Sequence, residues 1–189
     1  MKSLLNNMKR FPIYYLKLWD RENDIVYNEL FEIEVGANYE IADASYHSGW
    51  KTSPDGLQRA TIYGKGENAI EEGEALLVIE NLKTNKSTIY KLKDNSVAQN
   101  TPKYVEWIDE NRLFVIVGFA HGTVTKGGQL YEMNLEDNTV MPVFEDLAVN
   151  EEITSIKAND DGTFTYEKYD VFSEGYLEEG ILQLPPAKK

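Results

Sequence analysis

The sequence contains no cysteine, only two histidines and far fewer basic than acidic residues. Without cysteine the chain can form no disulfide, no thiolate metal site and no cysteine nucleophile. Lysine and arginine number 19 against 32 aspartates and glutamates, so the formal net charge is -13. The only basic clusters lie at the two ends of the chain, and nucleic-acid binding needs a basic patch on the folded surface. We therefore expect no nucleic-acid partner.

Long apolar runs are also missing. No stretch approaches the roughly 18 apolar residues of a membrane helix, so we expect no membrane partner. The N-terminal sequence MKSLLNNMKR is interrupted by Asn6, Asn7, Lys9 and Arg10 before an apolar export signal develops. The chain as given is therefore expected to be cytoplasmic, or extracellular or at the cell surface if a leader has been removed.

Aromatic residues are abundant, with 12 Tyr, 7 Phe and 3 Trp. Short β-branched and aromatic segments bounded by turn residues predict strands, and no segment has the apolar stripe of an amphipathic helix. The predicted strands are residues 14–19, 24–30, 60–63, 75–79, 87–92, 104–107, 113–117, 129–135, 139–144, 153–157, 163–169 and 180–184. This pattern indicates an all-β protein with antiparallel pairing.

The predicted strands repeat in three units, residues 45–95, 102–147 and 152–185. Each unit is a strand, a tight turn, a second strand, a loop ending in glycine and a third strand, and the first two units add a fourth strand. The turns at Gly56, Asn111 and Gly162 are 55 and 51 residues apart, which is a blade-sized period. Units of four antiparallel strands predict propeller-like repeats within a single domain of residues 1–189.

The number of units is low for a closed propeller, which has about four to eight blades. Residues 12–31 predict a further hairpin after an N-terminal tail of residues 1–11. Several arrangements are therefore alternatives. The hairpin completes a ring, the repeats form a β-sandwich or open stacked sheets, or two chains associate.

One stretch, WIDENRLFVIVGFAHGTVTKGGQLYEMNLEDNTV (residues 107–140), resembles a family of uncharacterised proteins from Gram-positive bacteria that is classed as a domain of unknown function. The shared elements are a Trp, an acidic turn, an apolar strand, and the pattern G[FY]AxGTVxxGGxLY before a further strand. The resemblance implies a propeller-like β fold. It brings no activity, cofactor or catalytic residue.

His121, in the loop FAHGTVTKGG, is the first candidate for chemistry. A catalytic imidazole needs a partner that orients it, and the loop contains Thr123, Thr125 and Lys126 but no serine or carboxylate. The second histidine, His47, is 74 residues away and has no metal-ligand spacing to His121. We therefore predict no catalytic residue, no metal site and no cofactor.

The three loops at residues 64–73, 119–128 and 172–180 occupy equivalent places in the repeat. Repeat β scaffolds gather such loops on one face, and that face usually binds. We expect a monomeric module that binds an unknown protein or small molecule, and not an enzyme. The expected ligand-binding residues are Phe119, His121, Thr123, Lys126, Phe172 and Tyr176.

Two other functions are alternatives. One is a hydrolase or lyase acting on a sugar or peptide with His121 and a carboxylate from another unit. The other is an assembly partner that uses an exposed edge strand, because the last unit stops after its third strand at GILQLPP.

Overall fold

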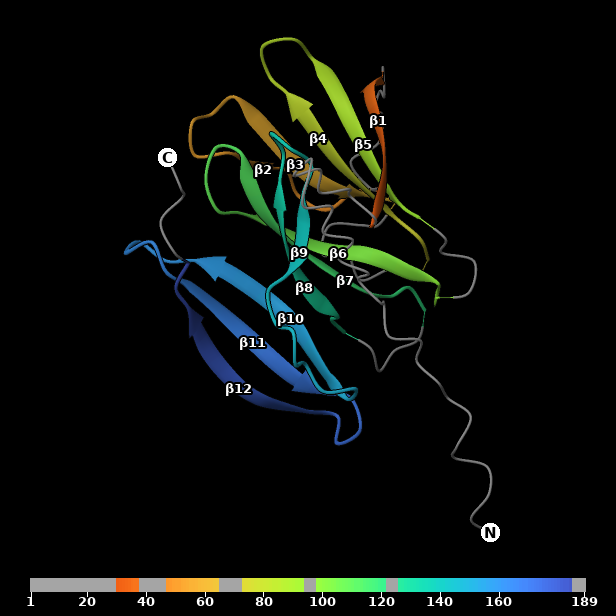
Figure 1. Ribbon diagram of the computed structural model, residues 1–189, viewed down its shortest axis with the longest axis vertical. Coiled ribbons are helices and arrows are strands. Elements are labelled where there is room, and N and C mark those ends of the chain that lie inside the picture. The colour runs from red at the N-terminus through yellow and green to blue at the C-terminus, as the bar shows by residue number, and fades with distance from the viewer. Residues whose placement is uncertain (1–29, 38–46, 65–72, 94–97, 122–125, 185–189) are drawn as a thin grey trace, which may run out of the picture.

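All twelve elements in the described part of the chain are β-strands, arranged in three antiparallel sheets (Figure 1). The computed structural model describes residues 30–37, 47–64, 73–93, 98–121 and 126–184. The predicted N-terminal tail and most of the predicted hairpin at 12–31 lie outside these residues. The described residues contain no helix of the length and hydropathy that a bilayer span requires. The predicted fold class, all-β with antiparallel pairing, is confirmed.

The first sheet has five strands in the order β1-β5-β4-β3-β2. Strands β2 (Lys51–Thr52), β3 (Gln58–Tyr63), β4 (Leu76–Asn81) and β5 (Lys86–Leu92) follow one another as the first repeat unit predicts. Strand β1 (Phe31–Ala37) adds to the outer side of β5 and was not predicted. Its sequence FEIEVGA does alternate apolar and acidic residues, which is the pattern of a half-covered strand.

The second sheet contains β6 (Asn100–Trp107), β7 (Arg112–Phe119), β8 (Gln129–Asn134) and β9 (Val140–Pro142), in that order. The third sheet contains β10 (Glu151–Ala158), β11 (Phe164–Asp170) and β12 (Gly175–Leu182). Each strand pairs with its neighbour in sequence, because a hairpin is the shortest connection between antiparallel strands.

The prediction of a loop at residues 172–180 is wrong. Strand β12 begins at Gly175, so that the connection from β11 is only the turn at residues 171–174. The carboxylate of Asp170 accepts hydrogen bonds from the backbone N–H of Phe172 at 2.8 Å and of Ser173 at 3.3 Å. Glu174 has a φ of 52°, which reverses the chain at once. A side-chain cap therefore closes the hairpin without a long loop.

The predicted tight turns have the expected geometry. Gly56 and Gly162 adopt positive φ of 72° and 81°, a conformation that glycine accepts without a steric penalty. The corresponding turn in the second sheet is closed by Asp109, whose Oδ1 accepts hydrogen bonds from the N–H of Asn111 at 3.0 Å and of Arg112 at 2.8 Å. Equivalent turns therefore join β2 to β3, β6 to β7 and β10 to β11, the first two strands of each repeat unit.

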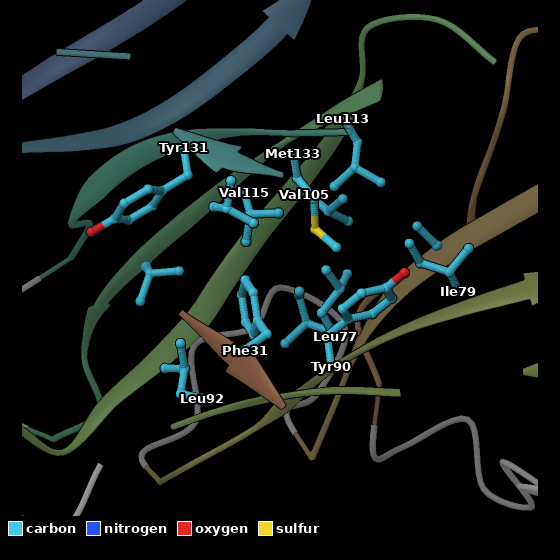
Figure 2. Close-up of a cluster of buried hydrophobic side chains, with 14 of the residues drawn as sticks. Phe31, Leu77, Ile79, Tyr90, Leu92, Val105, Leu113, Val115, Tyr131 and Met133 are labelled. Atoms are coloured by element: carbon cyan, nitrogen blue, oxygen red, sulfur yellow. The ribbon is translucent and has the colours of Figure 1, made fainter. Parts of the chain in front are cut away.

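Strand β7 explains how the sheets pack. Its sequence RLFVIVGF alternates side chains between two apolar faces. Leu113, Val115 and Val117 point into a core shared with the first sheet, while Phe114 and Ile116 point into a core shared with the third. Figure 2 shows the first of these cores, in which Phe31, Leu77 and Tyr90 face residues of the second sheet. A continuous apolar strand is thus required because both faces are covered.

The second sheet lies between the other two. Within the described residues, no buried cluster joins the first sheet directly to the third. The third sheet is apolar on the side that faces the second, where Phe164 and Tyr166 pack, and polar on the other side, where Thr165 and Glu167 lie. The repeats therefore form a propeller-like fan of three sheets.

Candidate functional site

Backbone hydrogen bonds bring the predicted loop regions together at one end of the sheets. The N–H of Gly73, at the end of the first loop, donates to the carbonyl oxygen of Ala120 at 2.9 Å. Gly128, at the end of the second loop, exchanges two hydrogen bonds with Ile153 of the third sheet, at 3.0 and 2.8 Å. The N–H of Val171, in the β11–β12 turn, donates to Asn150 at 2.8 Å. All three connections therefore lie at the same end of the molecule.

Close backbone approach accounts for the glycines of the second loop. A Cβ on Gly118 would lie 1.9 Å from the carbonyl oxygen of Gly127, and one on Gly127 would lie 2.0 Å from that of Ile153. A Cβ on Gly128 would lie 2.1 Å from the carbonyl oxygen of Val117. Only residues without a side chain fit here. The glycines are thus needed where the second sheet meets the third.

Two side-chain contacts continue this junction. The buried carboxylate of Glu152 accepts a hydrogen bond from the N–H of Gly127 at 3.0 Å. Lys126 extends over the ring of Tyr169, with Nζ 4.8 Å from the ring centroid. Because Tyr169 belongs to β11, the second loop covers part of the third sheet. The cation of Lys126 is held at the surface between two sheets.

Large apolar side chains are exposed at this end. Phe172 is 77% exposed, Val149 55% and Phe119 40%. Asn150 and Val171 are hydrogen-bonded neighbours, which places Val149 and Phe172 on adjoining segments. Phe119 also makes an edge-on contact with the imidazole of His121, with ring centroids 5.8 Å apart. Hereafter "the rim" denotes Phe119, His121, Lys126, Val149 and Phe172.

Four of the six predicted ligand-binding residues belong to the rim: Phe119, His121, Lys126 and Phe172. Thr123 lies outside the described residues, and so does the side chain of Tyr176, whose backbone is part of β12. Val149 was missed because it belongs to the connection from β9 to β10, outside the three predicted loops. The short apolar run LAV between acidic residues in EDLAVNEE was the available signal.

The surroundings of the two histidines are aromatic. His47 Nδ1 donates to the carbonyl oxygen of Ser48 at 2.6 Å, and its ring lies 5.6 Å from that of Trp50. Within the described residues no group of three or more His, Asp or Glu side chains has the arrangement of a metal site.

A pocket of about 420 Å³ lies at the opposite end of the second sheet. It is lined by Asp109, Glu110, Asn111, Arg112, Glu132, Asn134, Glu136, Thr139 and Met141. Arg112 forms ion pairs there with Asp109 at 2.7 Å and with Glu132 at 2.9 Å. These charge-assisted bonds raise the pKa of Arg112, against the opposing effect of burial. The guanidinium is thereby held by the turn that joins β6 to β7.

The first and second sheets are tied together by polar contacts along β2 and β6. Lys51 Nζ donates to the hydroxyl of Tyr104 and to Glu106 Oε2, both at 2.6 Å. The indole N–H of the buried Trp107 donates to the carbonyl oxygen of Lys51 at 2.8 Å. Within the first sheet, the guanidinium of Arg59 lies over the indole ring of Trp50, with Cζ 4.2 Å from the ring centroid. These residues are occupied in packing the sheets.

Comparisons with known proteins agree with this architecture. Residues 30–179 match the family described as Domain of unknown function (DUF4652), so the resemblance to a family of unknown function is confirmed, while its restriction to Gram-positive bacteria stays a prediction. A solved structure described as a "putative conserved lipoprotein" from Clostridium novyi NT is 30% identical, with a TM-score of 0.67 over 81% of this chain and 92% of that one.

The β-propeller domain of the Trilobed protease from Pyrococcus furiosus is 19% identical, with a TM-score of 0.40 over 75% of this chain and 44% of that one. This likeness is too distant to support a functional comparison. No curated protein matches the sequence.

Proposed function

The chain belongs to the DUF4652 family of unknown function, and from the geometry of its rim we propose that it is a binding module for a partner protein outside the cytoplasm. The observation that carries the proposal is the exposure of Phe172, Val149 and Phe119 at the end where all three sheets are connected. Scattered single apolar residues need no explanation, whereas apolar residues gathered at one end of a scaffold favour a docking surface.

Two further features support a protein partner. The backbone contacts around Gly127 and Gly128 give the rim a firm base, so little conformational freedom would be lost on binding. Aromatic side chains such as those of Phe119 and Phe172 are enriched in the centres of protein interfaces. The net charge of -13 disfavours anionic polymers, so the partner is expected to offer apolar groups and a neutral or basic surface.

The relative of known structure supports the proposed location. A protein 30% identical over most of its length is described as a "putative conserved lipoprotein", which favours a location of this chain outside the cytoplasm, bound to or released from the cell surface. Fractionation of the native host with an antibody against the chain would test this part. Recovery of the protein mainly with cytosolic markers would contradict it.

Site-specific photocrosslinking tests the rim in intact host cells. Replacing Phe172 by a photoreactive phenylalanine analogue should give a discrete crosslinked product on illumination. The additional substitution Phe119→Ser should reduce the yield at least about fivefold, because loss of an interface aromatic costs on the order of 1 kcal/mol or more.

The matched control places the same photoreactive residue at Met141, which is 53% exposed on β9 and belongs to the pocket at the other end of the sheet. We expect no discrete product there. Equal products at residues 141 and 172, or none at 172, would refute a rim interface.

A further inference from the structure

We propose that the outer edge of β12 (Gly175–Leu182) accepts an extended strand of a partner protein that carries a lysine or arginine opposite Glu179 and an aliphatic residue opposite Ile181. This surface is separate from the rim, and the inference stands whether or not the rim binds a partner. It would complete the third sheet in the way that β9 completes the second.

The repeat itself marks the position. In the first two sheets the third strand of the unit is covered on its outer side, β4 by β5 and β8 by β9. In the third sheet β12 pairs only with β11, and within the described residues no strand lies beyond it. An edge strand presents a row of backbone N–H and C=O groups that can pair with another chain. In the described part of the chain the third sheet therefore has one strand fewer than the second sheet.

The outer edge strands of the other two sheets, β9 and β1, are less suited to pair with an added strand. Strand β9 has only three residues and ends in Pro142, which cannot donate a ladder hydrogen bond. Strand β1 has an irregular register between Val35 and Ala37, and such irregularities blunt a sheet edge. Strand β12 also has one irregularity, because its Leu177 is skipped in the pairing with β11, but β12 is longer than β1 and its pairing is regular from Glu178 to Leu182. It is thus the outer edge best suited to accept a strand.

The charge expected on the incoming strand follows from the cross-strand pair of Glu167 and Glu179. Glu179 lies directly opposite Glu167 on β11, and like charges in this arrangement repel. Glu167 also accepts a hydrogen bond from Ser155 Oγ at 2.9 Å, whereas Glu179 makes no ion pair within the described residues. A basic residue on the far side of Glu179 would offset the repulsion. This row favours lysine or arginine in the partner.

The next cross-strand row on this face ends at β12 in an apolar residue. Ile181, two residues along β12, points to the same face as Glu179 and is 62% exposed. A cross-strand aliphatic neighbour would shield Ile181 from water and add a favourable side-chain contact. The preferred partner therefore alternates basic and β-branched residues on one face.

A second copy of this chain fits the edge less well. Strand β12 has the sequence GYLEEGIL, which contains no basic residue. Pairing two β12 strands would bring four carboxylates, Glu178 and Glu179 of each copy, into one short ribbon. We therefore expect the protein itself to remain a monomer.

Peptide binding to the full chain tests the proposal. The probe is an end-capped, fluorescently labelled ten-residue peptide, Lys-Thr-Val-Thr-Lys-Thr-Val-Thr-Lys-Thr, which presents lysine and valine in turn on one face, and fluorescence anisotropy measures its dissociation constant. We expect saturable binding at least about tenfold tighter than that of the matched peptide with glutamate for lysine. The substitution Glu179→Lys should weaken binding of the lysine peptide by a similar factor, since about 1.4 kcal/mol corresponds to tenfold.

Two controls separate strand pairing from general attraction to an acidic protein. Glu34→Lys makes the same charge change on the exposed edge strand β1 and should leave the affinity unchanged within about twofold. A lysine peptide methylated on alternate backbone nitrogens keeps its charge but loses its ladder donors, and it should not bind.

Equal weakening by Glu34→Lys and Glu179→Lys, or undiminished binding of the methylated peptide, would overturn the proposal. A dimer that light scattering detects and that Ile181→Lys dissociates would assign the edge to a second copy instead, which also overturns it.

Discussion

The junction between the second and third sheets yields the sharpest prediction. Gly128 and Ile153 exchange two backbone hydrogen bonds, at 3.0 and 2.8 Å. Substituting Gly128→Ala would place a Cβ 2.1 Å from the carbonyl oxygen of Val117 and 2.5 Å from the Cα of Gly118, whereas real Cβ contacts are essentially never below 3.0 Å. The atoms in the way belong to the backbone, so no rotamer change can relieve the clash.

The magnitude follows from the shift that this clash demands. Moving the Cβ about 1 Å farther from the oxygen would stretch the two hydrogen bonds to Ile153 beyond bonding distance. Each of these hydrogen bonds contributes about 1 kcal/mol to stability. Overpacking typically costs a further 1–3 kcal/mol or so. We therefore expect Gly128→Ala to lower the free energy of unfolding by about 3 kcal/mol. For a protein of this size the melting temperature should fall by roughly 10 °C.

Urea denaturation followed by tryptophan fluorescence measures this change. Gly49→Ala is the matched control, because a Cβ there meets nothing within 4 Å and the backbone is compatible with alanine. The control should change the free energy of unfolding by less than about 0.5 kcal/mol. Hydrogen exchange should show faster exchange of the Ile153 amide in Gly128→Ala. If Gly128→Ala is as stable as Gly49→Ala, the close approach of these backbones is refuted.

Two further predictions concern the core between the first and second sheets. Trp107→Phe removes the indole hydrogen bond to the carbonyl oxygen of Lys51 and should lower the free energy of unfolding by about 1 kcal/mol in urea, whereas an unchanged value would contradict that contact. Burial raises the pKa of Tyr90 from 10.0 to about 12. The buried, protonated phenol therefore stabilises the folded state fully below pH 10, and this stabilisation is lost as the pH rises through 12. The unfolding free energy should therefore fall by about 3 kcal/mol over this interval in the wild type, and Tyr90→Phe should abolish most of that slope.

Local sequence patterns predict much of the fold. The run LFVIV could be identified as a strand covered on both faces, because β7 alternates apolar residues toward two cores. The glycines at 56 and 162 identified tight turns, since positive φ is readily accessible to glycine. These features depend on residues close together in the chain.

Strand β12 was misplaced for a physical reason. Its glycines and paired glutamates are typical of a loop, yet charged residues are tolerated in a strand whose outer edge is exposed. Strand pairing with β11 outweighed the weak local preference, and the Asp170 cap shortened the connection. The short hairpin follows from pairing with a neighbouring strand and cannot be read from β12 alone.

Some features of the candidate site could also be predicted from the sequence, and others depend on tertiary packing. The presence of aromatic residues, a histidine and a lysine in the second loop is a property of the sequence, and so is the periodic placement of the loops. The contact of Gly127 with Ile153, the position of Lys126 over Tyr169 and the inclusion of Val149 depend on how the second sheet packs on the third. Periodicity specifies which segments become strands, turns and connections, because those preferences are local. Which connections meet, and which edge is left uncovered, is decided by tertiary packing, because it joins residues far apart in the chain.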